Sequence, residues 1–449
     1  MVIKQFEDKP LAHYSYAILS GNQIALVDPS RDPLPYYKFA EENNAKIVAV
    51  FETHPHADFI SGHLQIHKET NANIYVSKLV GADYPHVTFD DGDDLKMNNV
   101  IFTAINTPGH SPDGITIVVK DSDNKQAMFT GDTLFIGDVG RPDLREKAGN
   151  MKAKREQLAK DMFHTMQNKF NHLSDDTLVY PAHGAGSLCG KNMSSDSSST
   201  LGNERIGNWA FKTLTEDEFV AHILKDQPFI PSYFGFDVDI NKNGAPKFES
   251  SITDIPFQMN SSQIEDDTLI IDTRDQEIFK QNHLPNAVNI MARNNDDKIE
   301  TWLGSIVEPK EPFYLVISSV RRRQEIIARI AKIGYESQIK AVITMSSNVI
   351  EHSDAFNFTE FDKNKANYTI VDIRNKSEYN EGAFFDNVIN IPLNELRNSI
   401  EKIPTNKPIV IHCAGGYRSA AGSSIVSKEI KNTEVYDLSE RINNYNSKL

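Results

Sequence analysis

The sequence predicts an α/β protein built from three domains in tandem. Its 449 residues exceed what one hydrophobic core commonly serves, and an apolar content of 39% is enough to build several cores. The first half alternates short apolar runs with loops ending in His, Asp and Gly, which is typical of strands that present a site at their ends. The second half repeats one pattern of strand, loop and helix. We therefore expect domains at 1–244, 245–352 and 353–449.

Apolar runs in the first domain predict its strands. These runs are 16–19, 24–27, 47–51, 74–76, 101–105, 115–119 and 127–129. Residues 154–170 carry apolar side chains at every fourth position, which predicts a helix with its methionines in the core. The serine-rich stretch 194–200 is expected to be a loop, and a helical stretch is expected at 209–224.

The repeat in the second half is visible at the level of single strands. Residues 269–274 match residues 369–374, one hundred positions later. Each copy continues with a second apolar strand, at 314–317 and at 409–411, followed by a short loop and a helical stretch. Strand, loop and helix in this order predict a parallel sheet wrapped by helices, formed twice.

Composition excludes several classes of function. Lys and Arg total 47 against 62 Asp and Glu, and the net charge of −15 disfavours nucleic acid and anionic membrane surfaces as partners. The chain has no apolar run long enough to span a bilayer and no apolar signal core at its start, so we expect a cytoplasmic protein. Cys189 and Cys413 are the only cysteines, which argues for a reducing compartment and reactive thiols rather than a disulfide framework.

Histidines and aspartates follow the strand-like runs in an ordered set. Its members are His54, His56, Asp58, His110, Asp132 and His183. A lone histidine is commonly an ordinary surface or core residue, but here most of the set lies beside glycine or proline in turns that can bring ligands together. The ordered set therefore predicts a metal site. Phe59, directly after Asp58, has an apolar ring that cannot donate a lone pair to a metal.

The order H-x-H-x-D, then G-H, then G-D, then P-A-H-G resembles the metallo-β-lactamase superfamily over about the first 240 residues. The resemblance implies an αββα sandwich. The superfamily pattern usually continues with a histidine where this chain has Phe59. The second metal position, which in dinuclear members would also use Asp58 and His183, thereby loses a ligand.

Persulfide dioxygenases of this superfamily hold a single Fe(II) through two histidines and one aspartate. Carried over to this chain, the ligands are His54, His110 and Asp132. Such a face leaves positions open for O₂ and for a persulfide sulfur, so oxygen insertion becomes intramolecular. The resemblance implies mononuclear Fe(II) and oxidation of a thiol persulfide to sulfite. Zinc in the same box would only polarise water.

Other side chains could assist this chemistry. His56, Asp58 and His183 could orient ligands or shuttle protons. Cys189 could face the site, with a structural thiol as the equal alternative.

Two further candidates lie in the same region. Arg141, in a Gly-Asp-Val-Gly-Arg-Pro-Asp stretch that resembles one in the dioxygenases, is a candidate contact for an anionic substrate. An ion pair of Arg141 with Asp143 or Asp138 is the alternative. Tyr180 could donate a hydrogen bond to the bound thiol.

Cys413 follows an apolar strand and opens a helical stretch. The backbone N–H groups of its loop can converge on the sulfur, and the helix amino end adds positive potential that stabilises a thiolate. This persulfide loop comprises Ala414, Gly415, Gly416 and Tyr417, and Arg418 adds a cation. The form C-x-x-G-x-R resembles the rhodaneses, in which the cysteine carries sulfane sulfur. An inert packing thiol is the alternative.

The middle copy differs at this loop. Aligning Arg323 with Arg418 places Ser318 opposite Cys413, and the loop glycines are missing. A serine hydroxyl cannot store sulfane sulfur, so we expect a degenerate, non-catalytic domain. The consecutive arginines at 321–323 could bind an acidic thiol carrier or a neighbouring domain, or could simply be solvated.

The whole chain resembles persulfide dioxygenase–rhodanese fusions, most closely the CstB-type multidomain sulfurtransferases. The resemblance implies that sulfite made at iron attacks the outer sulfur of a Cys413 persulfide and yields thiosulfate, in a detoxification of sulfide. The thiol carrier could be coenzyme A, glutathione, bacillithiol or cysteine, and the resemblance implies a homo-oligomer, either dimer or tetramer.

Two rival functions remain. A dinuclear zinc thioester hydrolase of the glyoxalase II kind, fused to sulfur-carrier domains, is disfavoured by Phe59. A non-enzymatic persulfide sensor with Cys413 as a redox switch is disfavoured by the set His54, His110 and Asp132, because a sensor needs no open iron face.

Overall fold

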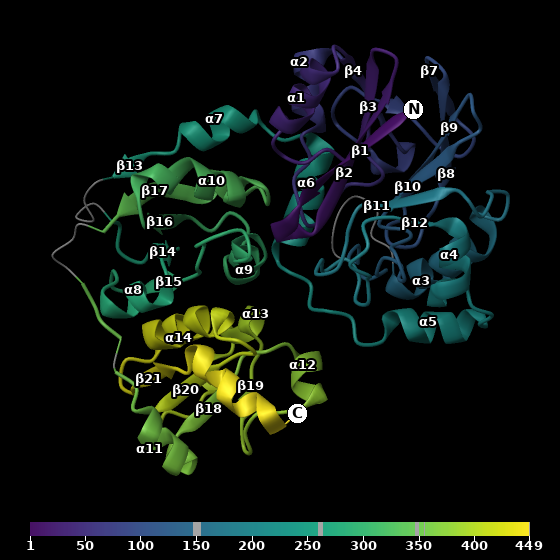
Figure 1. Cartoon of the computed structure of the whole chain (residues 1–449). Coiled ribbons are helices and arrows are strands. Elements are labelled where there is room, and N and C mark those ends of the chain that lie inside the picture. Colours follow the sequence, from purple (N-terminus) through teal and green to yellow (C-terminus); the bar gives the residue numbers. More distant parts are fainter. Residues whose placement is uncertain (147–153, 259–263, 346–349, 354, 449) are drawn as a thin grey trace. The chain divides into compact units, whose positions relative to one another are not determined.

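The chain divides into two compact units. The computed structural model describes residues 1–146, 154–258, 264–345, 350–353 and 355–448. The first unit holds Met1–Glu249 with Ala331–Gly334, and the second holds Ser250–Ile330 with Tyr335–Leu449 (Figure 1). Among the residues so described, none of the helices has the length and apolar character that crossing a membrane requires.

Two sheets form the centre of the first unit, each with six strands in the described residues. The first sheet runs in the order β1 (Val2–Asp8), β2 (His13–Ser20), β3 (Gln23–Val27), β4 (Lys46–Phe51), β5 (Asn73–Val76) and β6 (Val87–Thr88). The second sheet has the order β12 (Ser199–Thr200), β11 (Leu178–Pro181), β10 (Gln126–Gly131), β9 (Ile115–Asp121), β8 (Val100–Asn106) and β7 (Asp94–Met97). The pairs β3–β4, β4–β5 and β10–β11 are parallel, so their loops emerge at the carboxyl ends of neighbouring strands.

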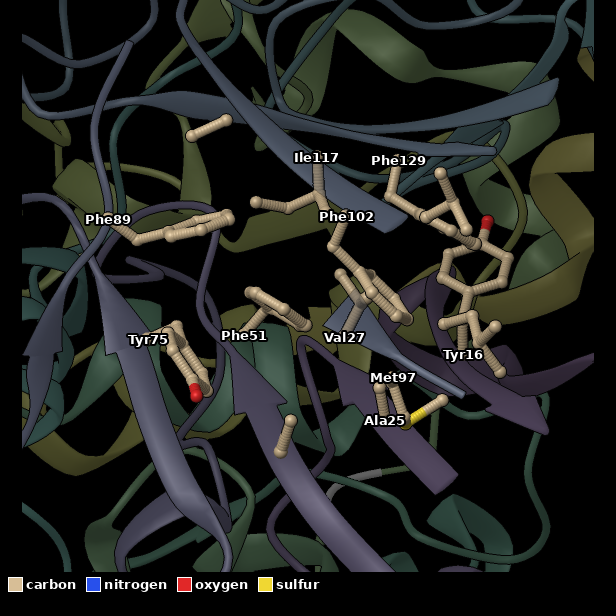
Figure 2. Close-up of a cluster of buried hydrophobic side chains, with 14 of the residues drawn as sticks. Tyr16, Ala25, Val27, Phe51, Tyr75, Phe89, Met97, Phe102, Ile117 and Phe129 are labelled. Atoms are coloured by element: carbon tan, nitrogen blue, oxygen red, sulfur yellow. The ribbon is translucent and has the colours of Figure 1, made fainter. Parts of the chain in front are cut away.

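The core of this unit lies between the two sheets. Tyr16 and Phe51 of the first sheet and Phe102, Ile117 and Phe129 of the second are at most 1% exposed. Figure 2 shows side chains of both sheets gathered in the space between them. The rings of Phe51 and Phe102 stack with their centroids 5.1 Å apart, a favourable aromatic geometry. Each sheet therefore buries its inner face against the other.

Helices cover the outer faces of the sheets. The helices of this unit are α1 (Leu34–Glu42), α2 (His63–Thr70), α3 (Arg155–His164), α4 (Leu201–Gly207), α5 (Glu216–Leu224), α6 (Tyr233–Asn243) and α7 (Phe248–Thr253), the last of which continues into the second unit. Helices α1 and α2 pack on the first sheet, and residues of α3, α4 and α5 share a buried cluster with the second sheet. The predicted αββα sandwich is confirmed.

The region after β10 confirms one helix prediction and corrects another. Helix α3 continues as a short π-helix at Thr165–Lys169, and Met162 and Met166 are buried in the core as expected. The helical stretch expected at 209–224 is broken, because a new helix, α5, begins at a capping box. There the Thr215 side chain accepts from the Glu218 N–H, and the Glu218 carboxylate accepts from the Thr215 N–H.

The second unit contains two parallel sheets in the described residues. The first has the order β13 (Phe257–Gln258), β17 (Ile339–Thr344), β16 (Phe313–Ile317), β14 (Leu269–Asp272) and β15 (Ala287–Asn289). The second has the order β19 (Ile389–Asn390), β18 (Thr369–Asp372), β20 (Ile409–His412) and β21 (Val435–Asp437). Their helices are α8 (Gln276–Gln281), α9 (Ile299–Ile306), α10 (Arg323–Ala331), α11 (Phe358–Lys363), α12 (Lys376–Glu381), α13 (Leu393–Leu396) and α14 (Tyr417–Glu429).

The two sheets are copies of one design. In each, the strand that carries the repeated motif ends in a buried aspartate bound by the arginine two positions later: Arg274 binds Asp272, and Arg374 binds Asp372. Strands β14 and β18 pair in parallel with β16 and β20, which lead into α10 and α14. The predicted duplication of a rhodanese-like α/β domain is confirmed.

Candidate metal centre and candidate cysteine site

The predicted metal ligands lie in loops at strand ends of both sheets. His54, His56 and Asp58 follow β4, and His110 follows β8. Asp132 comes directly after β10, and His183 shortly after β11. The sandwich therefore brings residues far apart in sequence to one of its edges.

His54, His110 and Asp132 form a compact donor set. Their ligand atoms lie within 4.8 Å of one another, and the Asp132 carboxylate is 3.8 Å from Nε2 of His54 and 3.5 Å from Nε2 of His110. All three residues are at most 4% exposed. Within the described part of the chain, Nε2 of His54 and both Asp132 carboxylate oxygens lack a hydrogen-bond partner. Buried polar atoms without partners at this spacing fit a metal ion.

Both histidines of this set are held so that Nε2 is free to bind. Nδ1 of His110 donates to the Arg141 carbonyl at 2.9 Å. The Thr53 hydroxyl donates to Asp28 at 2.8 Å and therefore accepts from Nδ1 of His54 at 3.0 Å. Burial lowers the pKa of His54 and of His110, so both are neutral imidazoles. Neutral rings with Nε2 free are the form that binds a metal.

His56, Asp58 and His183 form a second buried group, whose ligand atoms also lie within 4.8 Å of one another. Nε2 of His183 is 3.4 Å from Asp58 and 3.6 Å from Asp132. Burial lowers the pKa of His183, but the charges of Asp58 and Asp132 overcome this and raise it to about 9. His183 is therefore placed as a cation between two carboxylates. Nε2 of His56 lies 3.1 Å from Asp28.

Phe59 gives this second group an apolar wall. Its ring is 1% exposed, and its centroid lies 4.3 Å from that of His56 and 3.8 Å from that of His13. The His183 ring meets it edge-on at 6.4 Å. An aromatic face therefore stands where a further donor would complete a second metal site.

Arg141 forms the ion pair that the sequence left as the alternative to a substrate contact. Its side chain is buried, and its Nε and Nη2 donate to the two oxygens of Asp143 at 2.7 Å each. Nη1 donates to the Leu188 carbonyl at 3.2 Å, and Nη2 donates also to that of Pro228 at 2.6 Å. Because each guanidinium nitrogen has a partner, the ion-pair alternative is the observed arrangement. Arg141 contributes to the site through its carbonyl, which holds His110.

Tyr180 and Cys189 occupy different surroundings. The Tyr180 ring stacks on Phe129 at 5.5 Å, in the core between the sheets, and this packing gives no support to a hydrogen bond with a bound thiol. The Cys189 sulfur lies within 4.8 Å of ligand atoms of Asp132 and His183. Burial, with the charges of Asp58 and Asp132, raises the pKa of Cys189 well above its ordinary value. Cys189 is thus a neutral thiol beside the metal box.

Sequence reasoning missed a buried ion pair next to this centre. Nη1 and Nη2 of Arg145 bind the two oxygens of Asp113 at 3.2 and 2.9 Å, and both residues are 2% exposed. Asp113 follows His110 by three positions, so the pair ties the His110 loop to the segment after β10. The positive charge of Arg145 also contributes to the lowered pKa of His54 and His110. The sequence feature that could have indicated this pair is the position of Arg145, two residues after the Arg-Pro-Asp stretch at 141–143.

The loop of Cys413 connects β20 to α14 as expected. The thiol is 2% exposed, and the Gly416 N–H donates to its sulfur at 3.1 Å. Gly416 has a φ of +99°, and a Cβ added there would lie 2.7 Å from backbone atoms of Ser439 and Glu440. Only glycine fits this turn, which aims the backbone at the sulfur. Nη1 and Nη2 of Arg418 bind Glu378 at 2.7 and 2.6 Å.

Strand register corrects the predicted counterpart of Cys413 in the middle domain. The Thr273 N–H donates to the Val316 carbonyl, as the Ile373 N–H donates to the His412 carbonyl. Val316 thus corresponds to His412, and Ile317 rather than Ser318 stands opposite Cys413. The middle loop is one residue longer before its arginine, so alignment from Arg323 gave the wrong partner. Ile317 is buried, and the inference that this position cannot carry sulfur holds.

The arginines of the middle loop differ in their surroundings. Arg322 pairs with Glu325 one turn along the chain, and Arg323 donates to the carbonyls of Thr253 and Ile255. Arg321 is exposed.

Comparison with known families agrees with this geometry. Residues 8–183 match the model of the metallo-beta-lactamase superfamily, and residues 258–343 and 358–448 match that of the rhodanese-like domain. A crystal structure described as a metallo-beta-lactamase from Staphylococcus aureus subsp. aureus COL has a TM-score of 0.68 and 30% identity, over 76% of this chain and 99% of that one. The chain belongs to the metallo-beta-lactamase superfamily and carries two rhodanese-like domains behind that domain.

Two curated relatives represent two activities within this superfamily. The human mitochondrial persulfide dioxygenase ETHE1 is 28% identical over 165 residues, which are 36% of this chain and 59% of that protein. A hydroxyacylglutathione hydrolase of Pseudoalteromonas translucida is 32% identical over 185 residues, which are 40% of this chain and 63% of that protein. This chain therefore spans about six tenths of the length of these relatives.

Proposed function

We propose that this chain is a mononuclear Fe(II) persulfide dioxygenase whose sulfite is converted to thiosulfate at Cys413. The observation that carries the proposal is the contrast between the two buried donor groups. His54, His110 and Asp132 offer two imidazoles and a carboxylate at ligand spacing, whereas the second group, with His56 and His183, faces the apolar ring of Phe59.

Fe(II) held by the first group would keep open positions for a persulfide sulfur and O₂, and so supply oxygen insertion into that sulfur. The chain's own residues set the surroundings. The Arg141 carbonyl and Thr53 fix the ring planes of His110 and His54, and Phe59 and Phe135 present apolar rings to the neighbouring His56 and His183. The reaction balances as R-S-SH + O₂ + H₂O giving R-SH + SO₃²⁻ + 2 H⁺.

Cys413 would carry out the second step. Its thiolate attacks the outer sulfur of R-S-SH, the S–S bond breaks, and R-S⁻ leaves. The Gly416 N–H donates to the Cys413 sulfur and stabilises its anionic form. Sulfite then attacks the outer sulfur of the Cys413 persulfide. A new S–S bond forms, the old one breaks with its electron pair returning to Cys413, and thiosulfate departs.

The substrate and setting belong to the same proposal. The carrier is a small thiol of the coenzyme A, glutathione, bacillithiol or cysteine type, and the process removes sulfide in the cytoplasm. The active form is a homo-oligomer, dimer or tetramer. A metallo-beta-lactamase domain and rhodanese-like domains in one chain support this assignment, because the sulfite proposed for the first site is the nucleophile proposed for the second.

Anaerobic purification followed by metal quantification and oxygen uptake tests the first half of the proposal. We expect one iron per chain and one O₂ consumed per persulfide. Two zinc ions per chain without oxygen uptake would contradict it.

A two-zinc thioester hydrolase is the second candidate. It is favoured by the spacing of His56, Asp58 and His183, whose ligand atoms lie within 4.8 Å of one another, and by the matches to hydroxyacylglutathione hydrolases. Hydrolysis of an acyl-glutathione thioester by the zinc-loaded chain would support this candidate.

A further inference from the structure

The middle domain has no cysteine, yet its residues reach the persulfide loop of the last domain. The Tyr417 hydroxyl donates to the carbonyl of Met291, just after β15, at 2.8 Å. The guanidinium carbon of Arg418 lies 5.5 Å from the ring centroid of Trp302, on α9. Consecutive residues of the loop that contains Cys413 are thus each held by the degenerate domain.

We propose that the middle domain is a positioning half of the Cys413 site, in which Trp302 and the Met291 carbonyl orient Arg418 and Tyr417 so that Arg418 binds the oxygens of sulfite. This inference rests on the proposed sulfur transfer at Cys413 and assigns the middle domain a function within it. Trp302 is a positioning residue, because it acts on the substrate through Arg418.

Several contacts hold α14 against the middle domain along its length. The Asn289 N–H donates to the Ser424 hydroxyl at 3.0 Å, in the centre of α14, and α14 packs on β15. The same two domains are joined by Lys280 to Asp437 at 3.0 Å and by Arg397 to Glu311 at 2.8 Å. Because α14 begins in the Cys413 loop, these contacts also fix the direction in which its amino end points.

Arg418 is suited to hold an oxyanion once it is oriented. Glu378 occupies one donor on each terminal nitrogen, and a guanidinium has five N–H donors in all, so donors remain for a ligand. The side chain is 12% exposed, so an oxyanion that reaches it is largely removed from water. An indole face beside the guanidinium attracts the cation and sets its plane. In a chain with a net charge of −15, a local cation of this kind is what a dianion requires.

The experiment measures how the rate of thiosulfate formation depends on sulfite concentration when no O₂ is present for the iron reaction. The full-length chain is supplied with glutathione persulfide and added sulfite under strictly anaerobic conditions, and thiosulfate is quantified. We expect Trp302→Leu to raise KM for sulfite by about 3- to 30-fold, the range that a desolvated cation–ring contact covers, with a smaller change in kcat. Trp302→Phe keeps an aromatic face and is expected to restore KM to within about 3-fold of the natural chain.

Two further variants separate positioning from loss of packing. Tyr417→Phe removes only the hydroxyl that binds Met291 and is expected to raise KM by about 5-fold, the value of one net hydrogen bond. Glu311→Gln weakens another contact between the same domains and is expected to leave KM unchanged. Mass spectrometry of the Cys413 persulfide checks that the loop still accepts sulfur in every variant.

An unchanged KM in Trp302→Leu, or equal losses in Trp302→Leu and Trp302→Phe, would overturn the positioning role. A natural chain that forms no thiosulfate in this assay would instead contradict the proposed function itself. Oxygen uptake by the iron-loaded variants should equal that of the natural chain, and a parallel loss there would also overturn the inference.

Discussion

At the scale of one side chain, Phe59 places an apolar ring beside the second buried donor group. Its ring lies against His56 and faces His183, so the second donor group has an aromatic ring beside it where a further nitrogen ligand could otherwise lie. Gly416 has a comparable effect at the other site, because its backbone conformation brings an N–H to the sulfur of Cys413. Each site therefore depends on a residue that is not itself a nucleophile or ligand.

Phe59→His tests whether the missing ligand limits the chain to one metal. We expect the metal content to rise from one to two ions per chain, because an imidazole would join Asp58 and His183, and oxygen uptake to fall. Metal analysis of the purified variants measures this, with Phe59→Leu as the control that keeps one ion. A histidine variant that still holds one ion would show that Phe59 acts by packing alone.

Gly416→Ala tests the turn at Cys413. The added Cβ would meet the backbone of Ser439 and Glu440 at 2.7 Å with φ at +99°, so we expect a loss of about 1–3 kcal/mol of stability and loss of sulfur transfer. Gly415→Ala is the matched control, since a Cβ there has open space. Thermal unfolding and thiosulfate formation are the measurements, and equal behaviour of the two variants would contradict this account of the loop.

At the scale of elements, the ends of strands β4, β8, β10 and β11 bring the ligand loops together, and buried ion pairs hold those loops in place. Arg145 and Asp113 join the loop of His110 to the segment after β10. In the second unit, Arg274 and Arg374 close the ends of β14 and β18 in the same way in both copies. The strand ends thus position the loops, and the buried ion pairs hold the loops in place.

Asp113→Asn should weaken both the fold and the metal box. Removing one partner of a fully buried pair leaves a charge uncompensated, so we expect a loss of about 3–5 kcal/mol of stability and weaker iron retention. Glu156→Gln, at the exposed pair with Arg155, should leave both the stability and the iron content unchanged. Chemical unfolding and metal analysis decide, and a stable, iron-replete Asp113→Asn would refute the tethering role.

At the scale of the whole molecule, much of the design was predictable from the sequence. The ordered His and Asp set, the Cys413 loop and the repeat at 269–274 and 369–374 are local patterns, and they predicted the fold class and the clustering of His54, His110 and Asp132. The sequence alignment did not identify Ile317 as the counterpart of Cys413, because the hydrogen-bond register of the strands defines that position. The contact of Trp302 with Arg418 and the ion pair of Arg145 with Asp113 join residues that are distant in sequence. The sequence alone does not distinguish a buried, paired arginine from a solvated one.

The two-site scheme is tested most directly by the products of a Cys413→Ser chain. The iron-loaded variant is supplied with glutathione persulfide and O₂, and oxygen uptake, sulfite and thiosulfate are measured against the natural chain. We expect oxygen uptake to be unchanged, sulfite to accumulate and thiosulfate to be absent, because the hydroxyl cannot carry sulfane sulfur. A thiosulfate yield equal to that of the natural chain would contradict the scheme.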